Sequence, residues 1–518
     1  MYLLFRLSSI IHTQITVTSS VLMEEELTNV FESPPEDAES ASDSGRENTL
    51  QIPDGGWGWV ICFAGFMINF IAGGLFSGTE IFHWGLILLY QDTFYKTAMV
   101  EIIFDLIMMS VGPIVLLLLM FNVSHRQIII CGGFISAVST FTCIFVKKVE
   151  LLYVPYGTIS GCCVGLAYFS VNTIVGRYFK KKRALAVGIA HSGIGIGAFV
   201  LSYLLGQSIS YYGMRVTFLF ISGLFLSFIV YGALCRPLKT GNTKKKTNEI
   251  ILKSMKVLQT ERNLGFEPDE ETIENQELMH RSNSGGSMHH VNLETAPATN
   301  TNGTFSRKCK SLCKIIFDPV VLKNPGMLLL IFIYFFEGAS VMVTVYTPDM
   351  IDYIGMRRGH GALIIYIYCG VLGISQVIFG MLADLLHIPT SYILMASLLV
   401  SSAVCVAFTF CHSFAWLVFC ISLSAICRGF IFPLGIVLVA SILGVENLEK
   451  GYSPLCLLSG VSYIIHRIIA GSLLDATQSI DAVFYVFASF LFMACIMSCG
   501  IVYMQRNNKF SEYPEKDN

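Results

Sequence analysis

The chain has 518 residues, of which 54% are hydrophobic and only 14% are charged, whereas a soluble domain carries about 25% charged residues. The net charge of −2 gives no indication of a nucleic-acid partner, and the mean hydropathy of +0.63 argues against a soluble enzyme. Apolar runs long enough to cross a bilayer as helices recur along the chain. Because these runs are continuous and do not alternate as β-barrel strands do, we predict an all-α protein embedded in the lipid bilayer.

Residues 1–52 precede the first apolar run and are predicted to form a disordered cytoplasmic tail. From residue 24 this segment is acidic and rich in Ser and Pro (EEELTNVFESPPEDAESASDSG), a composition that buries too little apolar surface to fold. The N-terminal half, 53–235, follows and holds six candidate membrane spans. They are expected at 57–80, 98–120, 126–146, 151–175, 184–209 and 214–235.

The apolar pattern stops at residues 236–324, which are expected to form a largely disordered cytoplasmic loop. Its segments KTGNTKKKTN, RSNSGGSMHH and TAPATNTNGTF are polar and lack a regular period. The C-terminal half, 325–505, then repeats the six-span pattern, and residues 506–518 form a cytoplasmic tail. Its spans are expected at 325–350, 359–386, 390–410, 413–440, 453–475 and 481–505.

The Lys and Arg residues between spans predict the orientation, because short cytoplasmic loops carry an excess of positive charge. Arg177 and the basic cluster at 180–183 lie between spans 4 and 5, and residues 244–246 add three lysines in the central loop. Both regions are on one side if the spans alternate, so both termini of this multi-pass protein are predicted to be cytoplasmic. This layout is typical of major facilitator transporters, whose halves rock about a midplane site. By layout alone, a receptor or a channel would also fit.

A short motif, DGGWGWV, stands at residues 54–60, where the first span begins. Asp54 is expected to cap the free N–H groups of the helix that follows. Gly55 and Gly56 are expected to permit close approach between helix backbones, and Trp57 and Trp59 suit the membrane interface. The motif thus indicates a capped and tightly packed helix start, and the alternative is direct substrate contact by either tryptophan.

A second motif, YFKKKRALAVGIA, begins at Tyr178 near the start of the fifth span. It contains the aromatic pair Tyr178 and Phe179 and a Leu-Ala-x-Gly-x-Ala run that includes Gly188. Its basic cluster, which includes Lys182 and Arg183, is expected to anchor the chain at the lipid headgroups. Together the two motifs resemble the two signatures of the monocarboxylate transporter family (solute carrier family 16) of the major facilitator superfamily.

The resemblance identifies the chain as a divergent member of that family. It implies transmembrane helices in two six-helix halves, and secondary active or facilitative transport of a small organic solute across the plasma membrane by alternating access. It also implies that the solute is foremost a monocarboxylate, carried in symport with a proton, and that a single-span glycoprotein chaperone serves as a partner. No cofactor is expected, and the sequence has no Walker pattern, metal-ligand cluster or catalytic triad, so we do not predict an enzyme.

The eighth span departs from the family pattern. Proton-coupled members carry an Asp and an Arg four residues apart there, and the Arg holds the substrate carboxylate. Here Leu372 and Gln376 stand at those positions, and Ser77 stands near the position of a family lysine in span 1. Gln376 is therefore a candidate substrate-binding residue. Two alternatives stay open, namely transport of a neutral or zwitterionic metabolite without proton coupling, and a transporter-like sensor or scaffold.

Ionisable residues inside membrane spans are costly and mark functional sites by default. Span 2 contains Glu101 and Asp105, and span 11 contains Arg467. Asp105 and Arg467 each lie about eight residues from the outer ends of their spans, so at 1.5 Å per residue both are about 12 Å deep. Because these spans face each other in major facilitators, we predict that the pair serves in outer gating or proton coupling. Glu101, one turn from Asp105, is the alternative partner.

Two further charged residues lie near the middle of their spans, Glu337 in span 7 and Arg428 in span 10. In major facilitators these two spans border the central cavity. Arg428 is predicted to bind an anionic head group through its fixed charge and its fork of donors. Glu337 is predicted to be its counter-ion or a proton carrier. The alternative is a static ion pair that locks the two helices together.

Overall fold

The computed structural model describes residues 54–236, 319–347, 350–351, 359–385, 388–411 and 413–507. The predicted N-terminal tail and nearly all of the predicted central loop and C-terminal tail lie outside these residues. Within them every regular element is a helix, as the sequence predicts.

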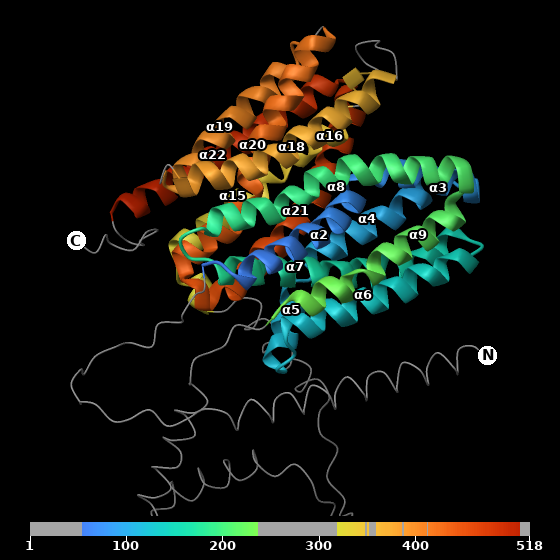
Figure 1. The fold of residues 1–518 in the computed structure, drawn as a ribbon. Coiled ribbons are helices and arrows are strands. Elements are labelled where there is room, and N and C mark those ends of the chain that lie inside the picture. Colours follow the sequence, from blue (N-terminus) through green and yellow to red (C-terminus); the bar gives the residue numbers. More distant parts are fainter. Residues whose placement is uncertain are drawn as a thin grey trace, which may run out of the picture. The chain divides into compact units, whose positions relative to one another are not determined.

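The N-terminal half forms a group of mostly long helices (Figure 1). Its elements are α2 (Trp57–Ser77), α3 (Thr79–Tyr90), α4 (Phe94–Ser110), α5 (Gly112–Met120), α6 (His125–Thr142), η1 (Cys143–Phe145), η2 (Val149–Leu152), the π-helical η3 (Tyr153–Ser160), α7 (Gly161–Tyr178), α8 (Arg183–Tyr212), α9 (Met214–Leu226) and α10 (Phe228–Leu234).

The C-terminal half repeats the arrangement. Its elements are α14 (Pro319–Leu322), α15 (Pro325–Glu337), α16 (Ala339–Val345), α18 (Gly359–Leu385), α19 (Thr390–Phe408), α20 (Phe414–Leu443), η4 (Val445–Asn447), α21 (Leu448–Thr477) and α22 (Ile480–Arg506).

The described residues contain eleven helices that are long and apolar enough to cross a membrane, and the bent pair of α4 and α5 supplies a twelfth span. The predicted spans are therefore confirmed as helices. In chain order, spans 1 to 6 are α2, α4 with α5, α6, α7, α8, and α9 with α10, and spans 7 to 12 are α15 with α16, α18, α19, α20, α21 and α22.

Two of the predicted spans extend five or more residues beyond their expected ends. Span 1 was expected to end at 80, but the helix resumes after Gly78 as α3 and runs to Tyr90. Phe82 supports this extension because its buried ring stacks on Tyr156 at 4.7 Å. Span 11 was expected to begin at 453, but α21 begins at Leu448. The carboxylate in its first turn, that of Glu449, is buried and paired with Arg177, so it does not end the helix.

Span 2 is bent by 46° between α4 and α5. Pro113 stands in the first turn of α5, where its missing N–H leaves the α4 ladder unfinished. The bend brings α5 against α21 of the other half, so closely that a side chain at Gly112 would meet the Ser453 backbone at 2.7 Å.

Helix α8 packs against both α2 of its own half and α18 of the other half (Figure 1). Glycines make both contacts possible, because a methyl group at Gly197 would strike the Phe70 carbonyl of α2 and one at Gly188 would strike the Gln376 carbonyl of α18. Such contacts between small residues allow close approach of membrane helices. The two halves thus meet backbone to backbone along α8 and α18.

Candidate functional site

The two signature motifs lie against each other at one end of the helices. Both Lys180 and Lys181 donate their backbone N–H groups to Asp54 Oδ1, at 2.5 and 2.8 Å. The rings of Trp59 and Phe179 have centroids 5.0 Å apart. The expectation that Asp54 caps its own helix is wrong, because the N-cap of α2 is Gly56 and no side chain caps it.

The glycines of the first motif act differently from the expectation. A methyl group at Gly55 or Gly56 would meet nothing within 4 Å, so neither makes a close helix contact. Gly56 is needed because its φ is 55°, in the left-handed region that favours glycine. The close contact belongs to Gly58, where an added Cβ would lie 3.0 Å from the Phe179 ring.

The remaining motif residues tie the end of span 6 to this corner. The Trp57 indole donates to the Leu234 carbonyl at 3.0 Å, and the Arg236 guanidinium lies 3.9 Å from the centre of the Trp57 ring. Tyr178 donates its hydroxyl to the Arg236 carbonyl at 2.6 Å. None of these side chains lines the cavity between the halves, so the geometry supports an anchoring role for the motif.

The basic cluster of the second motif divides between two roles. Lys182 is exposed, as expected for a group at lipid headgroups. Arg183 instead turns inward, and its Nε donates to the carbonyls of Gly176 and Phe179 at 3.0 Å each. The expectation that Arg183 faces lipid is therefore wrong, because it satisfies the free carbonyls at the end of α7.

A cavity of about 110 Å³ lies between the two halves. One water molecule needs about 10–15 Å³ on this measure, so the cavity has room for more than water alone. This space suits a small organic solute. The charged and polar groups on its wall include Asp105 and Tyr168 from the N-terminal half and Gln376, Arg428, Tyr463 and Arg467 from the C-terminal half.

Arg428 and Glu337 form a buried ion pair at this cavity. The Arg428 Nη1 donates to Glu337 Oε1 at 3.0 Å and to Ser340 Oγ at 2.6 Å, and the Ser340 hydroxyl donates to Glu337 Oε1 at 2.6 Å. The Arg428 Nη2 reaches the Tyr463 hydroxyl at 3.5 Å. Arg428 lines the cavity whereas Glu337 does not, so Glu337 stands behind it as a counter-ion.

The ion pair lies beside a break in span 7. Helix α15 ends at Glu337 and α16 begins at Ala339, with Gly338 between them. A methyl group at Gly338 would strike the Ser462 hydroxyl of α21. The guanidinium is thus bonded to both sides of this break, through Glu337 and Ser340.

Gln376 stands on the cavity wall where the family pattern places an arginine. Its side chain is only 1% exposed. Its Oε1 has no hydrogen-bond partner among the described residues. An acceptor left bare in a buried site is costly, so Gln376 Oε1 is a candidate acceptor for a donor group in the cavity.

The predicted outer-gate pair lies on the same cavity but is not joined. Asp105 and Arg467 both line it, yet no ion pair within 4.0 Å links them, and Asp105 Oδ1 has no hydrogen-bond partner in the described part of the chain. Glu101 faces His83 instead, with Oε1 and Nδ1 4.0 Å apart. The predicted gate residues Asp105 and Arg467 therefore line the same cavity but form no ion pair with each other.

On the opposite side, the two halves are joined by an ion-pair cluster that the sequence does not predict. Glu449 Oε1 of α21 accepts from Arg177 Nη1 of α7 at 2.5 Å and lies 3.3 Å from His125 Nε2 of α6. We call these three residues the motif-side latch. Nearby, Asp384 of α18 accepts from the Leu185 N–H of α8 at 2.8 Å. The halves are thus joined by polar contacts at the motif side, whereas Asp105 and Arg467 on the other side form no ion pair.

Comparisons with known proteins agree with this architecture. Residues 70–257 and 327–517 match the Major Facilitator Superfamily. Monocarboxylate transporter 12-B of Danio rerio is 27% identical over 465 residues, which cover 88% of this chain and 90% of that protein. Monocarboxylate transporter 14 of Homo sapiens is 24% identical, with 87% of this chain and 89% of that protein covered.

Monocarboxylate transporter 9 of Gallus gallus is also 24% identical, with 88% of this chain and 96% of that protein covered. Among solved structures, the transporter FucP in its outward conformation superposes with a TM-score of 0.51 and 15% identity, covering 86% of this chain and 99% of that one. At this identity the superposition bears on the fold alone.

These relatives and the shared fold are those of transporters and not of enzymes. The resemblance of the two motifs is confirmed by relatives that are named monocarboxylate transporters and match most of the chain. The chain therefore belongs to the Major Facilitator Superfamily and is similar over most of its length to monocarboxylate transporters.

Proposed function

We propose that the chain transports a small monocarboxylate across the plasma membrane by alternating access. The observation that carries the proposal is Arg428 on the cavity wall. A guanidinium has five N–H donors, and Glu337, Ser340 and Tyr463 take three of them. One donor on Nε and one on Nη2 remain, and we propose that they bind the two oxygens of a carboxylate.

The charges around the cavity favour coupling to one proton. Arg428 is balanced by Glu337, and Arg467 is balanced by Asp105. A bound monocarboxylate would therefore leave one uncompensated negative charge in a buried site, which is costly. We propose that Asp105 carries the compensating proton, because it lines the cavity and its Oδ1 has no hydrogen-bond partner among the residues that the structure describes.

A zwitterionic solute is the second candidate, and the same two bare acceptors favour it. Asp105 Oδ1 and Gln376 Oε1 would accept from an ammonium or amide group, while the solute carboxylate occupies Arg428. The solute would then supply its own positive charge and need no proton. The two candidates thus differ in one observable, the response of uptake to external pH.

Uptake by cells that express the chain tests both candidates. Labelled monocarboxylates and zwitterionic amino acids would be offered at acid and at neutral external pH, with Arg428→Gln and Arg428→Lys as variants. We expect saturable uptake that Arg428→Gln abolishes and Arg428→Lys weakens, because lysine cannot form the bidentate contact. Acid stimulation favours the monocarboxylate, and its absence favours the zwitterion. Full uptake by Arg428→Gln would remove Arg428 from the site.

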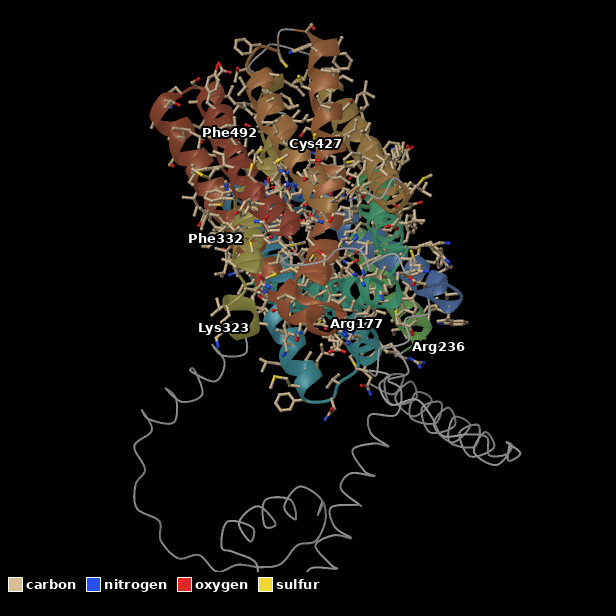
Figure 2. The ribbon with its side chains drawn as sticks, turned by 90° about the vertical axis from the view of Figure 1, so that its left-hand side faces the viewer. Arg177, Arg236, Lys323, Phe332, Cys427 and Phe492 are labelled. Carbon is tan, nitrogen blue, oxygen red and sulfur yellow. The ribbon has the colours of Figure 1, made fainter. Side chains whose placement is uncertain are left out.

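We propose the plasma membrane as the location, with both termini cytoplasmic. Arg177, Arg236 and Lys323 lie toward one end of the helices, near the points where the central loop leaves and rejoins them, and Cys427 lies toward the other end (Figure 2). Basic residues gather on the cytoplasmic side of membrane proteins. Co-purification from surface-labelled cells would test whether a single-span glycoprotein accompanies the chain.

A further inference from the structure

Two cysteines that take no part in the cavity lie together at the outer end of the C-terminal half. Cys411 is in the short turn after α19, and Cys420 is in the first part of α20. Their sulfur atoms are 3.9 Å apart, and each residue is only 1% exposed. Among the cysteines that the structure describes, no other pair has a sulfur-to-sulfur contact of this kind.

Hydrogen bonds on both sides of the turn fix the backbone near the two cysteines. Ser413 Oγ accepts from the Trp416 N–H at 3.3 Å and so caps α20. The Cys411 N–H donates to the Phe408 carbonyl at 3.1 Å, which continues the end of α19. With both flanking backbones fixed, the sulfurs need to approach by only about 2 Å to reach the S–S bond length of about 2.05 Å.

We propose that Cys411 and Cys420 form a disulfide in the mature protein. The inference rests on the orientation proposed above, which places this turn on the outer side, where thiols meet an oxidising environment during synthesis and afterwards. It does not depend on the transported solute. The buried thiols then form the bond before the turn packs, when both sulfurs are still reachable.

The chemistry is a thiol–disulfide exchange with an external disulfide, RSSR, as the oxidant. The thiolate of one cysteine attacks RSSR and releases one RSH as a mixed disulfide forms. The second cysteine thiolate then attacks the mixed disulfide and releases the second RSH. Two S–H bonds of the protein are lost, one S–S bond is gained, and RSSR is reduced to two RSH.

The bond would clasp the outer end of span 10. Arg428 lies eight residues after Cys420 on the same helix, or about 12 Å along its axis at 1.5 Å per residue. A covalent clasp at this turn fixes the top of the helix that presents Arg428 to the cavity. The disulfide would therefore link the stability of the outer turn to the position of Arg428.

Peptide mapping of the full-length protein tests the proposal. Protein from cells is denatured with N-ethylmaleimide present and no reductant, then cut with chymotrypsin, which cleaves after Phe414, Trp416 and Phe419. We expect the peptides of Cys411 and Cys420 to remain linked, with a mass two hydrogens below the sum of the free peptides. Cys495 and Cys499, one helical turn apart on α22, serve as the matched pair and should both carry the label.

Maleimide on both Cys411 and Cys420, in protein before and after treatment with oxidised glutathione, would overturn the proposal. A double variant, Cys411→Ser with Cys420→Ser, gives an independent measurement. Dithiothreitol should lower the thermal midpoint of the wild type and leave that of the double variant unchanged, and an equal response of both would count against the bond. An epitope inserted in the 146–148 turn and detected on intact cells fixes the orientation separately.

Discussion

The motif-side latch predicts the equilibrium between the outward-facing and inward-facing states of the chain. Arg177→Gln removes one partner of Glu449, whose side chain is 8% exposed, while Arg177 itself is 28% exposed. Breaking a fully buried pair costs about 3–5 kcal/mol, and an exposed pair contributes about 0.2–1 kcal/mol. We place the latch between them, at about 1–3 kcal/mol, because water screens Arg177 in part and His125 stays beside Glu449.

The latch stabilises only the state in which the motif side is closed, because its contacts join the two halves. Its loss should shift the equilibrium toward the inward-facing state by about 5- to 150-fold, the factor that corresponds to 1–3 kcal/mol. The cavity should then be open to the outside for a smaller share of the time.

Thiol labelling measures that share directly. Ser77→Cys places a thiol on the cavity wall, and an impermeant reagent applied from outside should modify it more slowly in Arg177→Gln. Exchanging the charges, with Arg177→Glu and Glu449→Arg together, should restore the rate. Lys96→Gln is the matched control, because it breaks an exposed ion pair with Glu150 inside one half.

Two results would refute this reasoning. Labelling of Arg177→Gln at the wild-type rate would mean that the latch does not hold the halves together. A charge exchange that labels no faster than Arg177→Glu alone would mean that the two residues do not act as a pair. A slowed rate in the Lys96→Gln control would point to a general loss of stability instead.

Three further predictions follow from the same contacts. Gly188→Ala should destabilise the α8–α18 contact by about 1–3 kcal/mol and abolish transport. Gly370→Ala on α18, whose Cβ would meet nothing within 4 Å, should leave stability and transport unchanged. Uptake and thermal unfolding measure the two effects. Asp105→Asn should remove acid stimulation of uptake, and joint reversal of Asp105 and Arg467 should recover more activity than either reversal alone. Asp54→Ala should lower the thermal midpoint, at a cost of about 1–2 kcal/mol from the lost backbone contacts, and leave the KM for the solute unchanged.

The sequence predicts the spans because bilayer burial acts on each segment separately. Apolar length is a local property, so the helices are found within a few residues. The errors at Gly78 and Leu448 arise where polar residues suggest a surface but tertiary partners keep the helix going. The pairing of Arg428 with Glu337 also follows from the sequence, since few charges lie near mid-span and they must neutralise each other.

The contacts that the sequence does not predict are those whose partners are remote in the chain. Asp54 looks like a helix cap because its neighbours are helical, but it bonds to backbone groups more than a hundred residues away. Glu449 looks like an ordinary surface acid at a helix start. Only the packing of α21 against α7 and α6 turns it into the centre of the latch.

The charges at and beside the cavity also have an electrical consequence. A membrane potential does work of about 2.3 kcal/mol per 100 mV on each net charge that crosses the field. Arg428 with Glu337, and Arg467 with Asp105, add up to zero, so the empty carrier should reorient without sensing voltage. The direction of net flux would then depend on chemical gradients, and a cell could depolarise without reversing it.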